Sequence, residues 1–270
     1  MADPRPIGLF DSGIGGLTVF RALGRRLPGE QILYLGDTAR VPYGNKSRET
    51  VTRYTRECAH FLLRRQIKAL VVACNTASAL ALPALLSELP VPTLGVLQPG
   101  AARACRLSAS ARIGVIGTEA TIRSGAYTEA IHRIRPGSEV FGVACPLFVP
   151  LAEEGWTEGE VERLVAQRYL SAFDGKGIDT LVLGCTHYPL LKGVIREALG
   201  PAIQLVDSAE AAAEEAARLL EAHELLDDRE RGGEPHFYVT DSSQRFAEVG
   251  SRFLGTSMGR LEQVDITGES

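Results

Sequence analysis

Two cysteines in this 270-residue chain each follow a short apolar run that is typical of a buried strand. Cys74 follows Leu70–Ala73, and Cys185 follows Leu181–Gly184. Ligands of open α/β sheets bind at the carboxyl ends of the strands, so both thiols are expected at a ligand site. A lone cysteine in such a place is more often part of the core. Two cysteines in equivalent positions favour chemistry.

Polar residues directly follow both cysteines: Asn75 and Thr76 after the first, Thr186 and His187 after the second. Such surroundings, with a helix N-terminus nearby, lower the pKa of a thiol. Inverting a stereocentre requires one group that removes the α-proton and a second group that delivers a proton to the opposite face. The pattern therefore predicts a two-thiol proton transfer, with Asp11 and His187 as the proton-handling neighbours.

A glycine-rich stretch, Phe10–Thr18, follows a strand-like run and precedes a helical one. Its spacing does not fit the dinucleotide-binding fingerprint, and no Walker lysine follows. We interpret it as a tight turn whose amide groups and Ser12 hydroxyl face a small anion at a helix N-terminus. A turn that serves packing alone is the alternative.

Short apolar runs alternate with amphipathic stretches along the whole chain, which predicts an α/β fold with mainly parallel sheets. A weak repeat, Ile7–Phe10 and Ile113–Ile116, predicts two pseudo-symmetric domains, each with a thiol at the carboxyl end of a parallel strand. The expected strands are Ile7–Phe10, Gln31–Leu35, Ala69–Ala73, Thr93–Val96, Arg112–Ile116, Glu139–Ala144, Thr180–Leu183 and Gln204–Val206.

Two stretches predict helices of ordinary length. Ser47–Arg65 has apolar residues at three- and four-residue spacings, with Ser47 as its cap. Glu210–Leu226 is rich in Ala, Glu and Leu, and the polar run Asp227–Pro235 after it predicts an exposed loop.

The composition is that of an ordinary soluble protein, with 45% hydrophobic and 23% charged residues. A formal net charge of -4 makes nucleic acid an unexpected primary partner. No apolar run is long enough to span a membrane, and the N-terminus shows no secretion signal, so we expect a cytoplasmic protein. Five cysteines without paired spacing support neither a disulfide framework nor a metal site.

Taken together, the motifs resemble those of the glutamate racemases, within the cofactor-independent aspartate/glutamate racemase superfamily. The resemblance spans essentially the whole chain. It implies a two-domain fold with the site between the domains, racemisation of glutamate without pyridoxal phosphate or another cofactor, and supply of D-glutamate for peptidoglycan. It rests on the stretches Gly8–Gly16, Gly36–Gly44, Ala73–Ser78 and Leu183–Pro189.

The resemblance also implies roles for residues. Cys74 would take the α-proton from D-glutamate and Cys185 from L-glutamate, while Asp11 and His187 assist. Glu153 matches a further acidic position near the second thiol. Glu119 and Ala120 stand where members often carry a third threonine, so the contacts of that loop are expected to differ. The implied substrate-binding residues are Asp11, Ser12, Tyr43, Gly44, Asn75, Thr76, Thr118, Thr121, Thr186 and His187.

Three alternatives stay open. An aspartate or hydantoin-type racemase would share the two-thiol logic, although His187 favours glutamate. A cysteine hydrolase or transferase would use Cys185 and His187, but side chains two apart on such a turn seldom form a nucleophile and base pair. A binding module for a small anion would leave the paired thiols without a purpose.

The first domain is expected to be discontinuous, covering residues 1–97 plus 209–270, with the second domain covering 98–208. The C-terminal stretch Pro235–Ala247 resembles the strand and helix with which family members return to the first domain. Members commonly dimerise, so a homodimer is one expectation.

Overall fold

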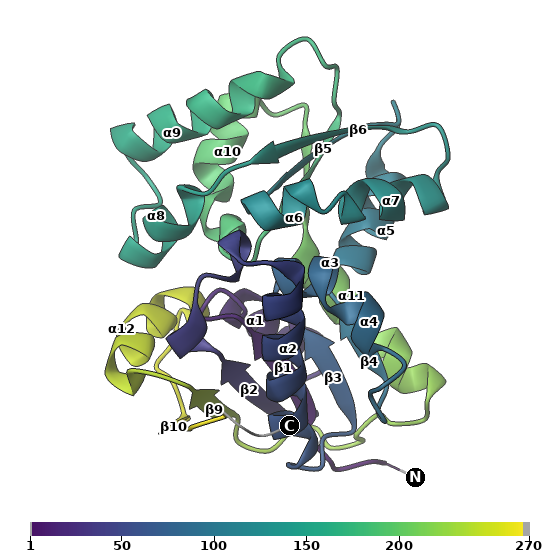
Figure 1. Cartoon of the computed structure of the whole chain (residues 1–270), viewed down its shortest axis with the longest axis vertical. Helices are drawn as coiled ribbons and strands as arrows, with labels where there is room; N and C mark the ends of the chain where they lie inside the picture. The colour runs from purple at the N-terminus through teal and green to yellow at the C-terminus, as the bar shows by residue number, and fades with distance from the viewer. Residues whose placement is uncertain (1, 267–270) are drawn as a thin grey trace.

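The computed structural model describes residues 2–266 and contains two sheets, one in each lobe of the molecule (Figure 1). All strand pairings within those residues are parallel, so the predicted α/β class is confirmed. The sheet of the first lobe has the order β10-β9-β2-β1-β3-β4, and that of the second lobe β6-β5-β7-β8. The strands are β1 (Ile7–Asp11), β2 (Ile32–Gly36), β3 (Ala69–Val72), β4 (Thr93–Gly95), β5 (Arg112–Gly117), β6 (Glu139–Ala144), β7 (Thr180–Gly184), β8 (Gln204–Asp207), β9 (His236–Val239) and β10 (Arg260–Gln263).

The two lobes share one strand order. The run β2-β1-β3-β4 in the first sheet corresponds to β6-β5-β7-β8 in the second. Gly8 in β1 pairs with Leu70 in β3, as Gly114 in β5 pairs with Leu181 in β7. The predicted pseudo-symmetry is therefore confirmed, and it places the residues after β3 and β7 at equivalent sheet edges.

Helices connect the strands and cover the sheets. The predicted helix Ser47–Arg65 is α2, and the Ser47 hydroxyl accepts a hydrogen bond from the Thr50 amide as expected for its cap. The predicted helix Glu210–Leu226 is α11, which Asp207 caps at its start. The α-helices are α1 (Leu17–Arg26), α2 (Arg48–Leu63), α3 (Asn75–Leu80), α4 (Leu82–Leu85), α5 (Leu97–Leu107), α6 (Glu119–Arg123), α7 (Ala126–Ile134), α8 (Phe148–Glu154), α9 (Glu160–Leu170), α10 (Lys192–Leu199), α11 (Ser208–Ala222) and α12 (Ser243–Leu254), and the 3-10 helices are η1 (Thr38–Arg40), η2 (Tyr43–Asn45), η3 (Ser171–Phe173) and η4 (Tyr188–Leu191).

The sheet of the first lobe is buried on both faces. Leu9 and Tyr34 pack on the side of α1 and α11, whereas Phe10, Leu33 and Leu35 pack on the side of α2. A central parallel strand with both faces covered has a continuous apolar sequence, and this is the pattern that marked these segments as strands. The rigid sheet fixes where its strand ends point.

The chain passes from the first sheet to the second between Gly95 in β4 and Arg112 in β5, and returns between Asp207 in β8 and His236 in β9. The proposed boundaries at residues 97 and 208 fall within these connections. Residues 1 and 267–270 of the predicted first domain lie outside the described residues. Among residues 2–266, no helix is long and apolar enough to cross a membrane.

Candidate active site

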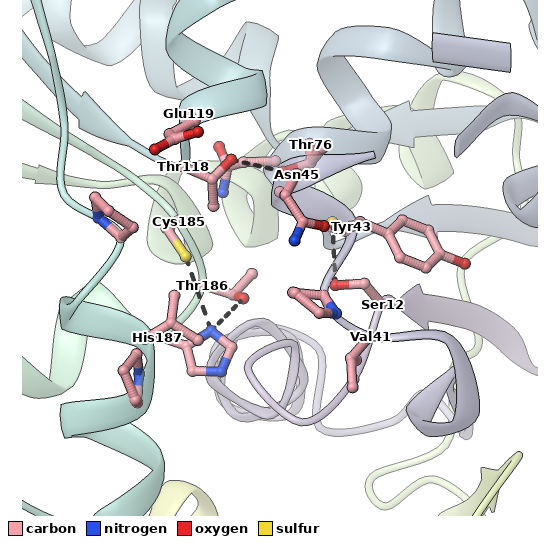
Figure 2. A pocket seen from close by; sticks show the side chains of 18 of the residues that line it. Ser12, Val41, Tyr43, Asn45, Thr76, Thr118, Glu119, Cys185, Thr186 and His187 are labelled. Atoms are coloured by element: carbon pink, nitrogen blue, oxygen red, sulfur yellow. Dashed lines mark hydrogen bonds between the residues drawn. The ribbon is translucent and has the colours of Figure 1, made fainter. Parts of the chain in front are cut away.

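A cavity of about 400 Å³ lies between the two lobes, where the carboxyl ends of β1, β3 and β7 meet (Figure 2). Its size is that of a pocket for a small metabolite. Figure 2 shows Cys185, Thr186 and His187 on one side and Ser12, Val41 and Tyr43 on the other. The lining residues are Ser12, Gly13, Val41, Pro42, Tyr43, Gly44, Asn45, Cys74, Asn75, Thr76, Thr118, Glu119, Pro146, Val149, Pro150, Glu153, Cys185, Thr186 and His187.

Cys74 stands where β3 leads into α3. Its sulfur caps the helix by accepting a hydrogen bond from the Ala77 amide, 3.5 Å away, and lies 3.4 Å from the Ser12 hydroxyl. The thiol is 5% exposed. Burial and the negative charge of Asp11 raise the pKa of Cys74 to about 12, although the hydrogen bond with Ser12 opposes the rise.

Cys185 stands at the equivalent edge of the second sheet, after β7. Its sulfur lies 3.8 Å from Nδ1 of His187, and Nε2 of His187 lies 3.0 Å from the Glu153 carboxylate. Burial lowers the pKa of His187, but the hydrogen bonds with Cys185 and Glu153 outweigh it and raise the pKa to about 10. The turn after β7 thus brings the His187 ring next to the Cys185 sulfur, although side chains two apart on such a turn seldom form a nucleophile and base pair.

Glu153 comes from α8, on another connection of the second lobe. Burial raises the pKa of Glu153, but its hydrogen bond with His187 and the charge of that ring outweigh burial and lower it. The His187 ring also meets the edge of Phe253 from α12 of the first lobe, with the ring centroids 5.5 Å apart. Cys185, His187 and Glu153 therefore form a row that reaches from the cavity to the C-terminal helix.

Asp11 does not line the cavity, although sequence reasoning placed it in contact with the substrate. The carboxylate is 1% exposed and accepts a hydrogen bond from the Gly13 amide at 3.0 Å. A Cβ at Gly16 would lie 2.4 Å from the Asp11 side chain, so only glycine fits over it. Burial raises the pKa of Asp11 against the opposing charge of His187. Asp11 thus lies behind the wall of the cavity rather than in it.

Three threonine hydroxyls join the lobes at the rim of the cavity. Thr76 of α3 lies 3.0 Å from Thr118 and 3.1 Å from Thr121, which are themselves 3.0 Å apart. Thr118 is also the cap of α6. Thr121 is buried behind the other two and does not line the cavity. This hydroxyl cluster presents donors to the cavity from both lobes.

Asn75 and Thr186 line the cavity as predicted, and each is held from behind. The Asn75 side-chain oxygen accepts a hydrogen bond from the Tyr127 hydroxyl at 2.6 Å. The Thr186 carbonyl accepts one from the Thr18 hydroxyl of the first lobe at 3.0 Å. Both contacts cross between the lobes.

Tyr43 and Gly44 belong to the short helix η2. The Tyr43 ring points away from the cavity in Figure 2, so it is the start of η2 rather than the phenol that faces the cavity. A Cβ at Gly44 would lie 2.7 Å from Thr118, so glycine permits this close approach to the second lobe.

Sequence reasoning missed part of the lining. Gly13, Val41 and Pro42 lie in stretches that the sequence analysis quotes, but periodicity gives no signal for which residues of a loop face inward. The missed residues are Gly13, Val41, Pro42, Asn45, Glu119, Pro146, Val149 and Pro150. In the described part of the chain, no group of three or more histidines, cysteines or carboxylates is placed to hold a metal ion.

Comparison with known proteins gives one consistent result. Residues 8–216 match the family model described as Asp/Glu/Hydantoin racemase. The glutamate racemase of Geobacter metallireducens is 57% identical over 98% of both chains. A crystal structure of the Francisella tularensis glutamate racemase in complex with D-glutamate is 42% identical, with a TM-score of 0.92 over 98% of this chain and 99% of that one. The Thermus thermophilus glutamate racemase in complex with β-chloro-D-alanine is 47% identical, with a TM-score of 0.90 over 100% of both chains.

Proposed function

The chain belongs to the Asp/Glu/hydantoin racemase family, and from that premise we propose that it interconverts L- and D-glutamate, supplying D-glutamate for peptidoglycan. The observation that carries the proposal is the pair of thiols, Cys74 and Cys185, at pseudo-equivalent strand ends on one cavity. The glutamate racemases described above support the choice of substrate.

The reaction needs one thiolate and one thiol. With L-glutamate bound, the Cys185 thiolate takes the α-proton, the C–H electron pair stays on the α-carbon, and the Cys74 thiol gives its proton to the opposite face. The product is D-glutamate, and the enzyme is left with a Cys74 thiolate and a Cys185 thiol. The reverse reaction uses the same steps in the opposite order.

The two thiols interact with different kinds of neighbouring groups. His187, charged and paired with Glu153, stabilises negative charge on Cys185. Ser12 and the Ala77 amide are hydrogen-bond partners for Cys74. The α-carbanion is stabilised by hydrogen bonds and by exclusion of water from the cavity between the lobes. The hydroxyl cluster of Thr76, Thr118 and Thr121 supplies donors for a carboxylate of glutamate.

The test is incubation of the purified protein with L-glutamate in deuterium oxide, without added cofactor. Entry of deuterium at the α-carbon and the appearance of D-glutamate are followed for the wild type and for Cys74→Ser and Cys185→Ser. The wild type is expected to racemise glutamate, and each variant to lose nearly all of that activity. Cys105→Ser is the matched control, because Cys105 is a buried cysteine on α5 that does not line the cavity.

The same assay separates the alternatives. Racemisation of L-aspartate in preference to L-glutamate would replace the proposed substrate. Full activity of Cys74→Ser toward any substrate would favour a hydrolase or transferase built on Cys185, His187 and Glu153. Binding of glutamate without incorporation of deuterium at the α-carbon would indicate that the protein is a binding module and not a racemase.

A further inference from the structure

Asp37 is a buried carboxylate that the proposed reaction does not use. It follows β2 within the stretch Gly36–Gly44, is 0% exposed, and is not among the residues that line the cavity. Burying a carboxylate is costly unless its oxygens accept hydrogen bonds. Its partners therefore indicate what it does.

Three side chains donate to the Asp37 carboxylate. The Tyr43 hydroxyl donates to Oδ2 at 2.5 Å, and Nε of Arg40 donates to the same oxygen at 2.7 Å. The Thr240 hydroxyl, which follows β9, donates to Oδ1 at 3.0 Å. Hydrogen bonds to an ionised acceptor are the stronger kind, so this carboxylate ties the ends of β2 and β9 to the loop that ends in Tyr43.

Arg40 is itself fixed by other partners. It forms an ion pair with Glu57 of α2, and its guanidinium carbon lies 4.1 Å from the centre of the Tyr54 ring. Arg40 and Tyr43 bracket Val41 and Pro42, so one carboxylate holds this segment on both sides.

The pinned loop is a wall of the cavity. Residues 41–45 all line it, and Gly44 packs closely against Thr118 of the second lobe. Figure 2 shows the Tyr43 ring pointing away from Cys185 and His187. The ring is 1% exposed, so its hydroxyl serves as an anchor for the backbone of Tyr43 and Gly44.

We propose that Asp37 is a positioning residue: through the Tyr43 hydroxyl and Arg40 it holds the loop of residues 41–45 against the Thr118 loop, and so sets the affinity for substrate. The inference rests on the proposed function for the identity of the substrate. It assigns no part in proton transfer to Asp37.

The variants Asp37→Asn, Tyr43→Phe and the double variant test this assignment. Asp37→Asn keeps the size but removes the charge that Arg40 and Tyr43 share, and Tyr43→Phe removes only the hydroxyl. KM for L-glutamate is expected to rise about tenfold in each single variant, the size of effect that loss of a hydrogen bond to a charged group produces. We expect little change in kcat, because the interaction serves ground state and transition state alike. The double variant is expected to resemble Asp37→Asn alone, since both changes break one contact.

Matched controls separate positioning from general stability. Asp179→Asn removes a carboxylate that accepts hydrogen bonds from Ser108 and the Ser110 amide in the second lobe. Tyr238→Phe removes a buried hydroxyl that is paired with His236. Neither residue lines the cavity, so both variants are expected to keep the wild-type KM even where the melting temperature falls.

A wild-type KM in folded Asp37→Asn and Tyr43→Phe would overturn the inference, as would additive effects in the double variant. If Asp37→Asn does not fold, Tyr43→Phe decides alone: a raised KM supports the assignment and an unchanged KM refutes it. The dissociation constant of L-glutamate, measured by calorimetry on the same proteins, gives an independent result. It tests the loop even if the wild type binds glutamate without racemising it, in which case only the proposed function fails.

Discussion

The two thiols stand in unequal electrostatic surroundings although their backbones are pseudo-equivalent. Cys74 has a carboxylate, Asp11, as its charged neighbour, and burial together with that charge raises its pKa to about 12. Cys185 has the imidazole of His187 at 3.8 Å, and the pKa of that ring is raised to about 10. The Cys74 sulfur thus lies next to a carboxylate, whereas the Cys185 sulfur lies next to an imidazole that carries a positive charge below pH 10.

This asymmetry depends on Glu153, which leads to a pH prediction. Replacing Glu153 by Gln removes a carboxylate 3.0 Å from Nε2, so the pKa of His187 is expected to fall by about 1 to 3 pH units. In the wild type the imidazolium is lost only as pH rises through about 10, and in the variant it is lost at lower pH. The basic limb of the kcat/KM profile should move to lower pH accordingly. NMR titration of the His187 ring gives the direct measurement.

Glu154→Gln is the matched control, because Glu154 neighbours Glu153 in α8 but is exposed. It is expected to leave the titration of His187 unchanged. A His187 titration in Glu153→Gln equal to that of the wild type would show that the carboxylate does not hold the proton on the ring.

Sequence reasoning identified most of the residues that line the cavity, because strand ends in a parallel sheet collect at one edge. It did not predict how those side chains are held. Asp37 and Tyr43 meet through a turn, and Phe253 reaches His187 from a helix at the far end of the chain. Such contacts depend on tertiary packing, for which a single sequence carries no periodic signal. The roles of the site residues stay predictions.

At the scale of elements, the eight strands predicted from apolar runs are all present within a residue of their expected bounds. Five of them are central strands, whose two buried faces give a continuous apolar sequence, and the other three, β4, β6 and β8, are sheet edges that still carry apolar residues. The edge strand β10 was not predicted. Its residues Arg260–Gln263 are largely exposed and polar, so their sequence is typical of a loop. Only the pairing with β9 identifies them as a strand.

A buried ion pair links the residues that precede the central strands β2 and β3. Lys68 precedes β3 and Glu30 precedes β2, with their charged atoms 2.5 Å apart and their side chains 0% and 2% exposed. Lys68 also donates to the Asp3 carbonyl at 2.7 Å, and Glu30 accepts from the Asp227 amide at 2.9 Å. The pair therefore ties the N-terminal segment and the loop after α11 to the sheet.

Lys68→Met is expected to lower the free energy of unfolding by about 3 to 5 kcal/mol, because it leaves a buried carboxylate without its partner. Urea denaturation followed by circular dichroism measures the loss. Arg56→Met is the control, since its pair with Glu88 is exposed and exposed pairs contribute little. Equal midpoints for the two variants would mean that the buried pair does not fasten the strands. The KM of folded Lys68→Met should stay at the wild-type value, because neither partner lines the cavity.

At the scale of the whole molecule, the site exists only while the two lobes are in contact. The first lobe supplies Cys74 and the loop of residues 41–45, and the second supplies Cys185, His187 and Thr118. Close contacts hold the lobes in register: the hydroxyl cluster on one side, and the contact of the Gly15 turn with Thr186 and His187 on the other. The distance between the thiols is thus set by packing between lobes as much as by either sheet.

Gly15→Ala tests this dependence. A Cβ at Gly15 would lie 2.2 Å from the Thr186 hydroxyl and 2.4 Å from Nδ1 of His187, so either the lobes separate or the imidazole moves off Cys185. Misplacement of a catalytic group by about 1 Å costs about a hundredfold in rate, and kcat/KM is expected to fall by at least that much. Gly24→Ala is the control, because Gly24 lies in α1, the helix that follows this turn, and a Cβ there meets nothing within 4 Å. This variant should match or slightly exceed the wild-type stability and keep its activity. For both variants, kcat/KM is obtained by monitoring the racemisation of glutamate with circular dichroism. If Gly15→Ala kept the wild-type kcat/KM while folded, contact between the lobes at this turn would have no part in setting the geometry of the thiols, and the hydroxyl cluster would have to hold the lobes in register without it.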